Sequence, residues 1–299
     1  MTVAVRRSYV DGRQGQMHVR ISGAADGRHP PLVCMHMSPM TGRVYQKFLA
    51  RIGEDRMGIA FDTPGFGLSD PAPAPPRIED YAEDILSGID ALGVRGPFDL
   101  MGYHTGSMIS VALARFAPTR VRRIIMVSAP IFPLAEREQF RSYYGHRQPD
   151  AEGTHLLKRW KGFYYHHMRP GTTVAQIADA FSDALLGGEI EWWGHRAAFE
   201  YELERELAGV SQVVLILNPG DDLDIQTRRA QGLAANSRIL EVPGWGHGFL
   251  DLYTADAAAL ARAFLDADDQ APFAHVAVPP SAAGPRYPER TGSFPPAGA

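Results

Sequence analysis

The sequence predicts an α/β protein with a mostly parallel central sheet, helices on both faces of the sheet, and a helical cap inserted between two strands. Three observations lead to this prediction. Short apolar runs alternate with helical periodicity through residues 31–128. A glycine-rich turn at 102–106 joins one of the predicted strands to a helix. Residues 131–207 then carry only helical patterns before apolar, strand-like runs resume.

The elements follow in order along the chain. Residues 9–21 predict a hairpin, because two short stretches flank a polar turn. Buried strands are expected at 31–35, 57–61, 97–101, 121–128, 213–217 and 238–242, and helices at 43–52, 78–92, 107–116 and 254–265. The cap would hold helices at 135–144, 154–166, 173–186 and 191–206.

These elements divide the chain into a core and two further segments. Residues 1–130 and 208–266 would form the core, with the helical cap at 131–207 between them. Residues 267–299 turn rich in proline, alanine and glycine, and we expect this tail to be disordered because it offers little apolar surface to bury.

Composition limits the classes of function. The chain has 299 residues, 45% of them hydrophobic and 21% charged, with a net charge of −4, so a basic nucleic-acid-binding surface is not expected. The single cysteine, Cys34, lies in an apolar run and allows no intrachain disulfide. No apolar run suits a membrane span or a signal peptide. We expect a cytoplasmic protein with a small-molecule substrate. The composition does not decide between a monomer and a homodimer.

The turn Gly102-Tyr103-His104-Thr105-Gly106 is the most informative local pattern. A sharp turn from strand to helix lifts its central side chain above the sheet edge, and its crowded neighbours must be glycine. Histidine tolerates the positive φ of such a turn better than a β-branched residue does. The helix that follows directs its positive end toward the same place. His104 is therefore the first candidate catalytic residue.

Two further candidates follow later strands. Asp222 comes after the predicted strand 213–217, with Asp221 and Asp224 as competing acids, and His247 comes after the strand 238–242. A carboxylate at a strand end can accept the Nδ1 proton of a histidine and fix its tautomer. We expect Asp222 to orient His247 in this way.

Several of these motifs resemble those of the α/β-hydrolase superfamily, in the branch with a helical cap. Residues 102–106 match its G-x-S-x-G nucleophile elbow with histidine in place of serine. Residues 62–70 resemble the D-x-x-G-x-G-x-S-D loop of that branch, and residues 243–247 resemble its P-x-x-G-H element. The resemblance covers roughly residues 8–266 and implies the α/β-hydrolase fold.

The resemblance also implies roles for individual residues. His36-Met37-Ser38 is similar to the H-G-x oxyanion loop, with methionine where glycine is usual. The backbone N–H groups of Ser38 and Thr105 would then stabilise the oxyanion. Asp222 matches the acid position, although Pro219 replaces the usual glycine nearby.

Histidine at the elbow has three interpretations. His104 is a nucleophile that forms an acyl-imidazole, or it is a base for a lyase, a retro-aldol cleavage or a direct water attack, or the site is inactive and binds a ligand. We favour a cofactor-free hydrolase of an ester, a thioester or a C–C bond in a small hydrophobic carbonyl compound. A lyase and a non-catalytic ligand-binding protein are the alternatives. If the scaffold is otherwise competent, replacing His104 by serine should raise ester hydrolysis.

The remaining candidates line the expected substrate pocket or are set aside. The pocket residues are His36, Met37, Tyr103, Trp160, Tyr164, Trp192 and Trp245. For Trp160, Tyr164, Trp192 and Trp193 the first interpretation is packing of the cap on the core, and some of them would line the pocket. Thr105 and Ser107 are expected to be structural rather than nucleophilic. His166 and His167 are adjacent on a helix and face different directions, so no metal site and no cofactor are expected.

Overall fold

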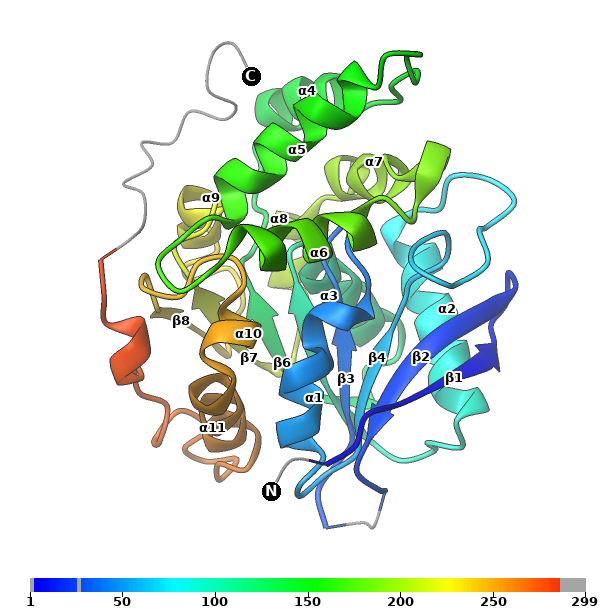
Figure 1. Cartoon of the computed structure of the whole chain (residues 1–299). Coiled ribbons are helices and arrows are strands. Elements are labelled where there is room, and N and C mark those ends of the chain that lie inside the picture. Colours follow the sequence, from blue (N-terminus) through cyan, green and yellow to red (C-terminus); the bar gives the residue numbers. More distant parts are fainter. Residues whose placement is uncertain (1–2, 26–27, 286–299) are drawn as a thin grey trace.

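The computed structural model describes residues 3–25 and 28–285, and an eight-stranded sheet forms its centre in the order β1-β2-β4-β3-β5-β6-β7-β8 (Figure 1). The strands are β1 (Arg6–Asp11), β2 (Gln16–Ser22), β3 (Leu32–Met35), β4 (Gly58–Phe61), β5 (Phe98–Tyr103), β6 (Val121–Val127), β7 (Val213–Asn218) and β8 (Ser237–Glu241). β1 and β2 form the expected hairpin, and β2 pairs antiparallel with β4. All other neighbours are parallel, which confirms the mostly parallel sheet.

Helices cover both faces of the sheet, as expected. α1 (Gln46–Ile52) and α11 (Thr254–Leu265) pack on one face, and α2 (Ile78–Ala91) and α3 (Thr105–Phe116) pack on the other. Side chains alternate along β3, so that Leu32 and Cys34 join the core under α1 and α11, whereas Val33 and Met35 join the core under α2 and α3. A strand buried on both faces needs this continuous apolar run.

Between β6 and β7 the chain forms a segment of five helices among the described residues. They are α4 (Leu134–Tyr143), α5 (Thr154–His167), α6 (Val174–Ala184), α7 (Trp193–Glu200) and α8 (Leu203–Ala208). The helices α4 to α7 lie above the carboxyl edge of the sheet (Figure 1). The helix expected at 191–206 is interrupted, because Tyr201 adopts an extended backbone conformation between α7 and α8.

The segment after Asp266 differs from the expected disordered tail. Residues 267–285 pack on the core: Val276 and Ala282 are buried, and the Gly244 N–H donates to the Ala282 carbonyl at 3.0 Å. The few apolar side chains of this segment join the core under α1 and α11, which composition alone does not reveal. Residues 286–299 lie outside the described residues.

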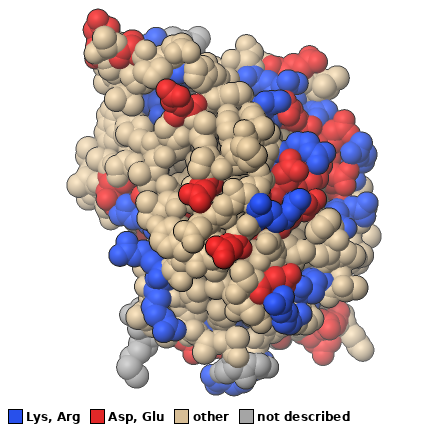
Figure 2. Space-filling model, turned by 90° about the vertical axis from the view of Figure 1, so that its right-hand side faces the viewer, with Lys and Arg blue, Asp and Glu red and all other residues tan. Residues whose placement is uncertain are grey.

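The surface mixes both signs of charge. On the face that carries β1, β2 and α2, basic and acidic side chains lie close together (Figure 2). Arg77 and Asp80 form one such pair at 3.4 Å. Within residues 3–25 and 28–285, no helix has the length and apolar character that crossing a bilayer requires.

Candidate active site

The elbow at the end of β5 holds His104 above the carboxyl edge of the sheet. Its φ is 49°, in the left-handed region. A Cβ at position 102 would lie 2.1 Å from the Gly106 carbonyl oxygen, and a Cβ at position 106 would lie 2.1 Å from the Met35 carbonyl oxygen. Only glycine fits at either position. The His104 N–H donates to the Val127 carbonyl at 3.0 Å, which ties the elbow to β6.

His104 pairs with Asp221. The distance between His104 Nε2 and Asp221 Oδ2 is 2.8 Å. Ser128, directly after β6, donates its hydroxyl to the same carboxylate oxygen at 2.7 Å, and the Leu223 N–H donates to Asp221 Oδ1 at 3.0 Å. Asp221 is the alternative to Asp222 as the acid that the sequence predicts. In the structure Asp221 is buried and is the partner of the elbow histidine.

His247 pairs with Asp222, as the sequence suggests, but through the other ring nitrogen. The carboxylate contacts His247 Nε2 at 2.6 Å, whereas Nδ1 faces the Tyr103 hydroxyl at 3.4 Å. The expected contact with Nδ1 is therefore wrong in this structure. Tyr103 stands under the ring, with its centroid 6.1 Å away, and its position leaves Nε2 as the nitrogen that reaches Asp222.

The backbone conformation of the loop that carries His247 requires glycine at two positions. Gly246 has φ of 52°, and a Cβ there would overlap the Arg169 guanidinium, whose Nη1 donates to the Trp245 carbonyl. Gly248 also has a positive φ, of 79°. Since Arg169 belongs to the loop between α5 and α6, this contact fastens the helical segment to the His247 loop.

The charges and the burial at the site shift the pKa values of its histidines in different directions. Burial alone would lower the pKa of His104, but the charge and hydrogen bond of Asp221 raise that pKa above its usual value. Burial opposes ionisation of Asp222, yet His247 beside it holds the pKa of Asp222 well below its usual range. Burial and the neighbouring His104 lower the pKa of His195 to about 4. His195 is therefore neutral near pH 7, while Asp222 is ionised.

His36 orients the loop expected to stabilise the oxyanion. The Thr63 N–H donates to His36 Nε2 at 3.0 Å, so the proton of the neutral ring lies on Nδ1, which donates to the Met37 carbonyl at 3.0 Å. Burial also lowers the pKa of His36 and favours this neutral form. Thr105 is the first residue of α3, so its N–H lacks an intrahelical partner. The oxyanion role of Ser38 and Thr105 stays a prediction.

A cavity of about 240 Å³ adjoins the His247 side of the site. Met37 and Tyr103, two of the expected pocket residues, line it, together with Met40, Arg43, Val44, Gln46, Lys47, His167, Gln176, Asp179, Ala180, Asp183, Gly248, Leu250 and Asp251. His167 contacts the His247 ring at a centroid distance of 4.7 Å, which connects the cavity to the histidines.

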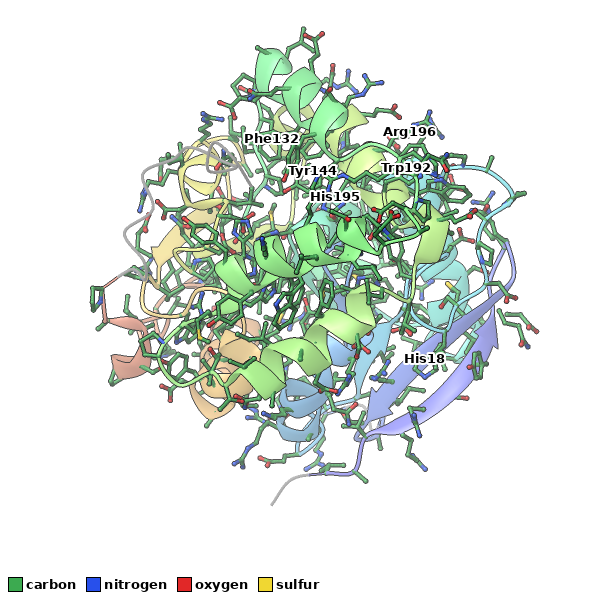
Figure 3. All side chains as sticks on the ribbon, turned by 45° about the horizontal axis from the view of Figure 1, so that its top comes forward. His18, Phe132, Tyr144, Trp192, His195 and Arg196 are labelled. Atoms are coloured by element: carbon green, nitrogen blue, oxygen red, sulfur yellow. The ribbon has the colours of Figure 1, made fainter. Side chains whose placement is uncertain are left out.

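The expected tryptophans lie elsewhere. Trp192 lines a second cavity of about 230 Å³ in the helical segment, where Tyr144, His195 and Arg196 lie close by (Figure 3). Trp160 packs between Tyr164 and Phe181, at centroid distances of 5.7 and 5.4 Å, and lines neither cavity.

Trp245 is a core residue rather than a pocket residue. Its side chain is fully buried and stacks on Phe249 at 4.6 Å. Its Nε1 donates to the Ser281 hydroxyl at 3.1 Å, which holds the segment after Asp266 against the loop. Its neighbour His247 reaches the site because the chain reverses at Gly246.

The fold and motifs agree with known proteins. The family model described as alpha/beta hydrolase fold matches residues 30–154. A solved hydrolase from Pseudomonas aeruginosa superposes with a TM-score of 0.72 at 19% identity, covering 86% of this chain and 97% of that one. The protein has the α/β-hydrolase fold.

The curated relatives of this protein are distant. A pyrrolizixenacetamide deacetylase from Xenorhabdus hominickii is 26% identical over 268 residues, or 84% of this chain and 96% of that protein. A bifunctional esterase/perhydrolase from Acinetobacter calcoaceticus is 23% identical over 205 residues, or 64% of this chain and 74% of that protein. These similarities support a general α/β hydrolase.

Three features of this site could not be predicted from the sequence motifs. Ser128 was passed over, although a polar residue directly after a β-branched strand is a usable signal. His195 carried no motif, and only its place on α7 brings it near His104. The Asp221–Asp222 pair was visible in the sequence, but nothing there shows that each carboxylate takes a different histidine.

Proposed function

We propose that this protein is a hydrolase that uses water to cleave an ester, a thioester or a C–C bond in a small hydrophobic carbonyl compound. Its α/β-hydrolase fold and its similarity to hydrolases support the reaction class. One observation carries the site assignment: at the elbow, His104 is paired with a buried carboxylate, Asp221, as a general base would be.

The pairing favours a base over a nucleophile. Asp221 engages His104 Nε2, so Nδ1 is the nitrogen that remains for chemistry. Nδ1 is bonded to Cγ, the ring carbon that carries Cβ, and this crowding hinders its attack on a carbonyl carbon. A water molecule is small enough to reach it. His104 therefore acts on water in this proposal, and no acyl-imidazole forms.

The reaction balances with the groups at hand. His104 Nδ1 takes a proton from water while the water oxygen bonds to the carbonyl carbon. The Ser38 and Thr105 N–H groups stabilise the oxyanion that forms. When the bond to the leaving group breaks, His247, oriented by Asp222, gives that group a proton and regains one from solvent. His104 then releases to solvent the proton that it took from water. The substrate carbonyl thus becomes a carboxylic acid.

The cavity beside His247 suits a small substrate, because part of its lining is apolar and the rest carries charged and amide side chains. Its volume of about 240 Å³ is at the low end of small-molecule sites. Met37, Met40, Val44 and Leu250 contribute apolar side chains to it, with Tyr103 at the end near the histidines. The acyl portion of the substrate would occupy this space, with the carbonyl facing His104.

The test compares the hydrolysis of p-nitrophenyl acetate and butyrate by the wild type, His104→Ala and His247→Ala. We expect kcat/KM to fall by about 10² or more in both variants. His155→Ala is the matched control, because His155 also pairs with a carboxylate, Asp150, but outside the site. It should keep wild-type rates. Mass spectrometry during turnover should find no acyl adduct on His104.

Equal rates in the wild type, His104→Ala and His247→Ala would contradict the proposal that this site hydrolyses esters. A tight ligand without turnover would then favour the binding-protein alternative, and turnover of an aldol or C–C substrate without water uptake would favour a lyase. An acyl adduct on His104 would show that His104 is a nucleophile and would contradict its role as a general base.

A further inference from the structure

Four ligand-type side chains converge at the candidate site. His104, Asp221, Asp222 and His247 each offer one atom, and these atoms all lie within 4.8 Å of one another. We propose that a divalent transition-metal ion, with Zn²⁺ as the best fit, binds between these four side chains. The sequence does not predict this site, because its ligands come from three separate loops.

The orientation of the two histidines is the first argument. Both rings turn Nε2 toward the carboxylates, and in His247 this reverses the Nδ1 contact that a carboxylate–histidine catalytic pair would use. Nε2 is the ring atom farthest from the backbone and a common metal ligand. The rings face each other at a centroid distance of 5.3 Å, with an angle of 64° between their planes. They can therefore approach one ion from different directions.

Charge is the second argument. Asp221 and Asp222 are consecutive, and both direct a carboxylate into the same space, Asp221 with a fully buried side chain and Asp222 with 21% exposed. Two carboxylates so close repel each other unless a cation lies between them. One divalent ion balances both charges and leaves both histidines neutral, as metal ligation requires.

The surroundings fit metal ligands as well. The Ser128 hydroxyl donates to Asp221 Oδ2 at 2.7 Å, and the Tyr103 hydroxyl lies 3.4 Å from His247 Nδ1, where it can accept the remaining ring proton. Such partners fix the tautomer of a ligating histidine and the direction of a ligating carboxylate. The ion has a path from solvent, because 14% of the His104 side chain is exposed.

The donor set selects the ion. Two imidazoles and two carboxylates suit Zn²⁺ and, less well, other first-row ions, whereas Ca²⁺ and Mg²⁺ prefer oxygen ligands alone. Tetrahedral bonds of about 2.0–2.2 Å place ligand atoms about 3.3–3.5 Å apart. The His–Asp pairs, now at 2.8 and 2.6 Å, would open slightly while the longer distances of the cluster contract. Small side-chain rotations achieve this.

This inference goes beyond the proposed hydrolase and does not depend on it. If the ion is present during turnover, a water would have to bind to it as a fifth ligand. The ion would then polarise that water in place of His104, and the water would lose its proton to solvent. The overall reaction stays a hydrolysis. Metal binding can therefore be measured without a substrate, and hydrolysis can be measured after the metal is removed.

Calorimetric titration of the EDTA-treated, dialysed full chain with ZnCl₂ tests the site. We expect one Zn²⁺ per chain in the wild type and binding about tenfold weaker or more in Asp222→Asn and His247→Ala. Asp150→Asn removes a carboxylate from the other His–Asp pair, that of His155, and should bind as the wild type does. Co²⁺ in place of Zn²⁺ should give the visible absorption of a tetrahedral site, lost in Asp222→Asn. Circular dichroism checks that each variant is folded.

The outcomes separate the two proposals. Zn²⁺ binding at equal strength in the wild type and in Asp222→Asn, or no binding by the folded wild type, overturns the metal site. If hydrolysis persists in EDTA in that case, the proposed function still stands. If Zn²⁺ binds as expected and no ester is cleaved with or without it, the metal site stands and the hydrolase proposal falls.

Discussion

Asp221 and Asp222 are consecutive in the chain but hold different histidines: Asp221 contacts His104 at 2.8 Å, and Asp222 contacts His247 at 2.6 Å. The two pairs differ in their surroundings. Asp221 is fixed by Ser128 and by a backbone N–H, whereas Asp222 is partly open to solvent. A substitution at either aspartate should therefore affect one histidine more than the other.

Asp221→Asn should lower the pKa of His104. In the wild type, Asp221 raises that pKa, so the neutral ring that acts as a base is lost as the pH falls through a value above the usual one. Without the charge, the rise of kcat/KM with pH should begin at lower pH, while its plateau falls by about 10² or more. NMR titration of the His104 ring in EDTA-treated protein measures the shift.

Asp222→Asn is the matched control for that experiment. Its charge also raises the pKa of His104, but as the last and smallest cause. We therefore expect a smaller shift than in Asp221→Asn. Equal shifts in the two variants would mean that the pairing differs in solution.

His104→Ser should not create a serine hydrolase. The sequence suggested a gain in ester hydrolysis, but His247 Nε2 is engaged by Asp222, and a serine side chain is shorter than the imidazole it replaces. No nitrogen of His247 is then placed to activate the hydroxyl. Stopped-flow kinetics should show no acyl-enzyme burst and rates no higher than those of His104→Ala. A burst would show that the His247 ring rotates and presents a nitrogen to the serine hydroxyl.

Asp99→Asn should flatten part of the pH dependence of stability. Asp99 is fully buried, and burial raises its pKa to about 6, although it forms an ion pair with Arg122 at 2.7 Å. Between its ordinary pKa of 3.8 and this value the folded state binds more protons, so the free energy of unfolding falls as pH rises through this window. The fall is at most about 3 kcal/mol.

Urea unfolding of the wild type and Asp99→Asn at several pH values between about 4 and 7 measures this effect. The wild type should lose stability across this range by more than the variant does. Parallel curves for the two proteins would contradict a raised pKa at Asp99.

Ala282→Glu should detach the segment that follows α11. Ala282 is fully buried beside Gly244, and its carbonyl accepts the Gly244 N–H at 3.0 Å. A carboxylate there would lose its hydration without a partner, so we expect the melting temperature to fall by several degrees. Ser281→Ala, which removes the hydroxyl that contacts Trp245 and Asp256 but buries no charge, should cost less. Unchanged melting in Ala282→Glu would mean that the segment is not attached in solution.

The sheet and most helices could be predicted because their signals are local. A run such as Leu32–Met35 is apolar at every position, and α11 begins and ends where its periodicity does. Tyr201 shows the limit: it breaks a helix that its neighbours would continue, and only tertiary contacts decide this.

The site was only partly predictable for a related reason. Motifs place His104, Asp222 and His247 at strand ends that meet at one edge, so their proximity follows from topology. Which ring nitrogen meets which carboxylate depends on distances of an ångström between loops. Tyr103 under His247 and Ser128 beside Asp221 set those distances, and neither lies in the motif that it supports.

The close approaches at the elbow have an evolutionary consequence. They are made by the backbone at Gly102 and Gly106, while the side chain between them takes no part in these approaches and reaches Asp221 instead. Selection on folding therefore acts on the two glycines and leaves the residue between them open to any type that accepts a positive φ. One codon at position 104 can change the chemistry of the protein while its architecture is inherited intact.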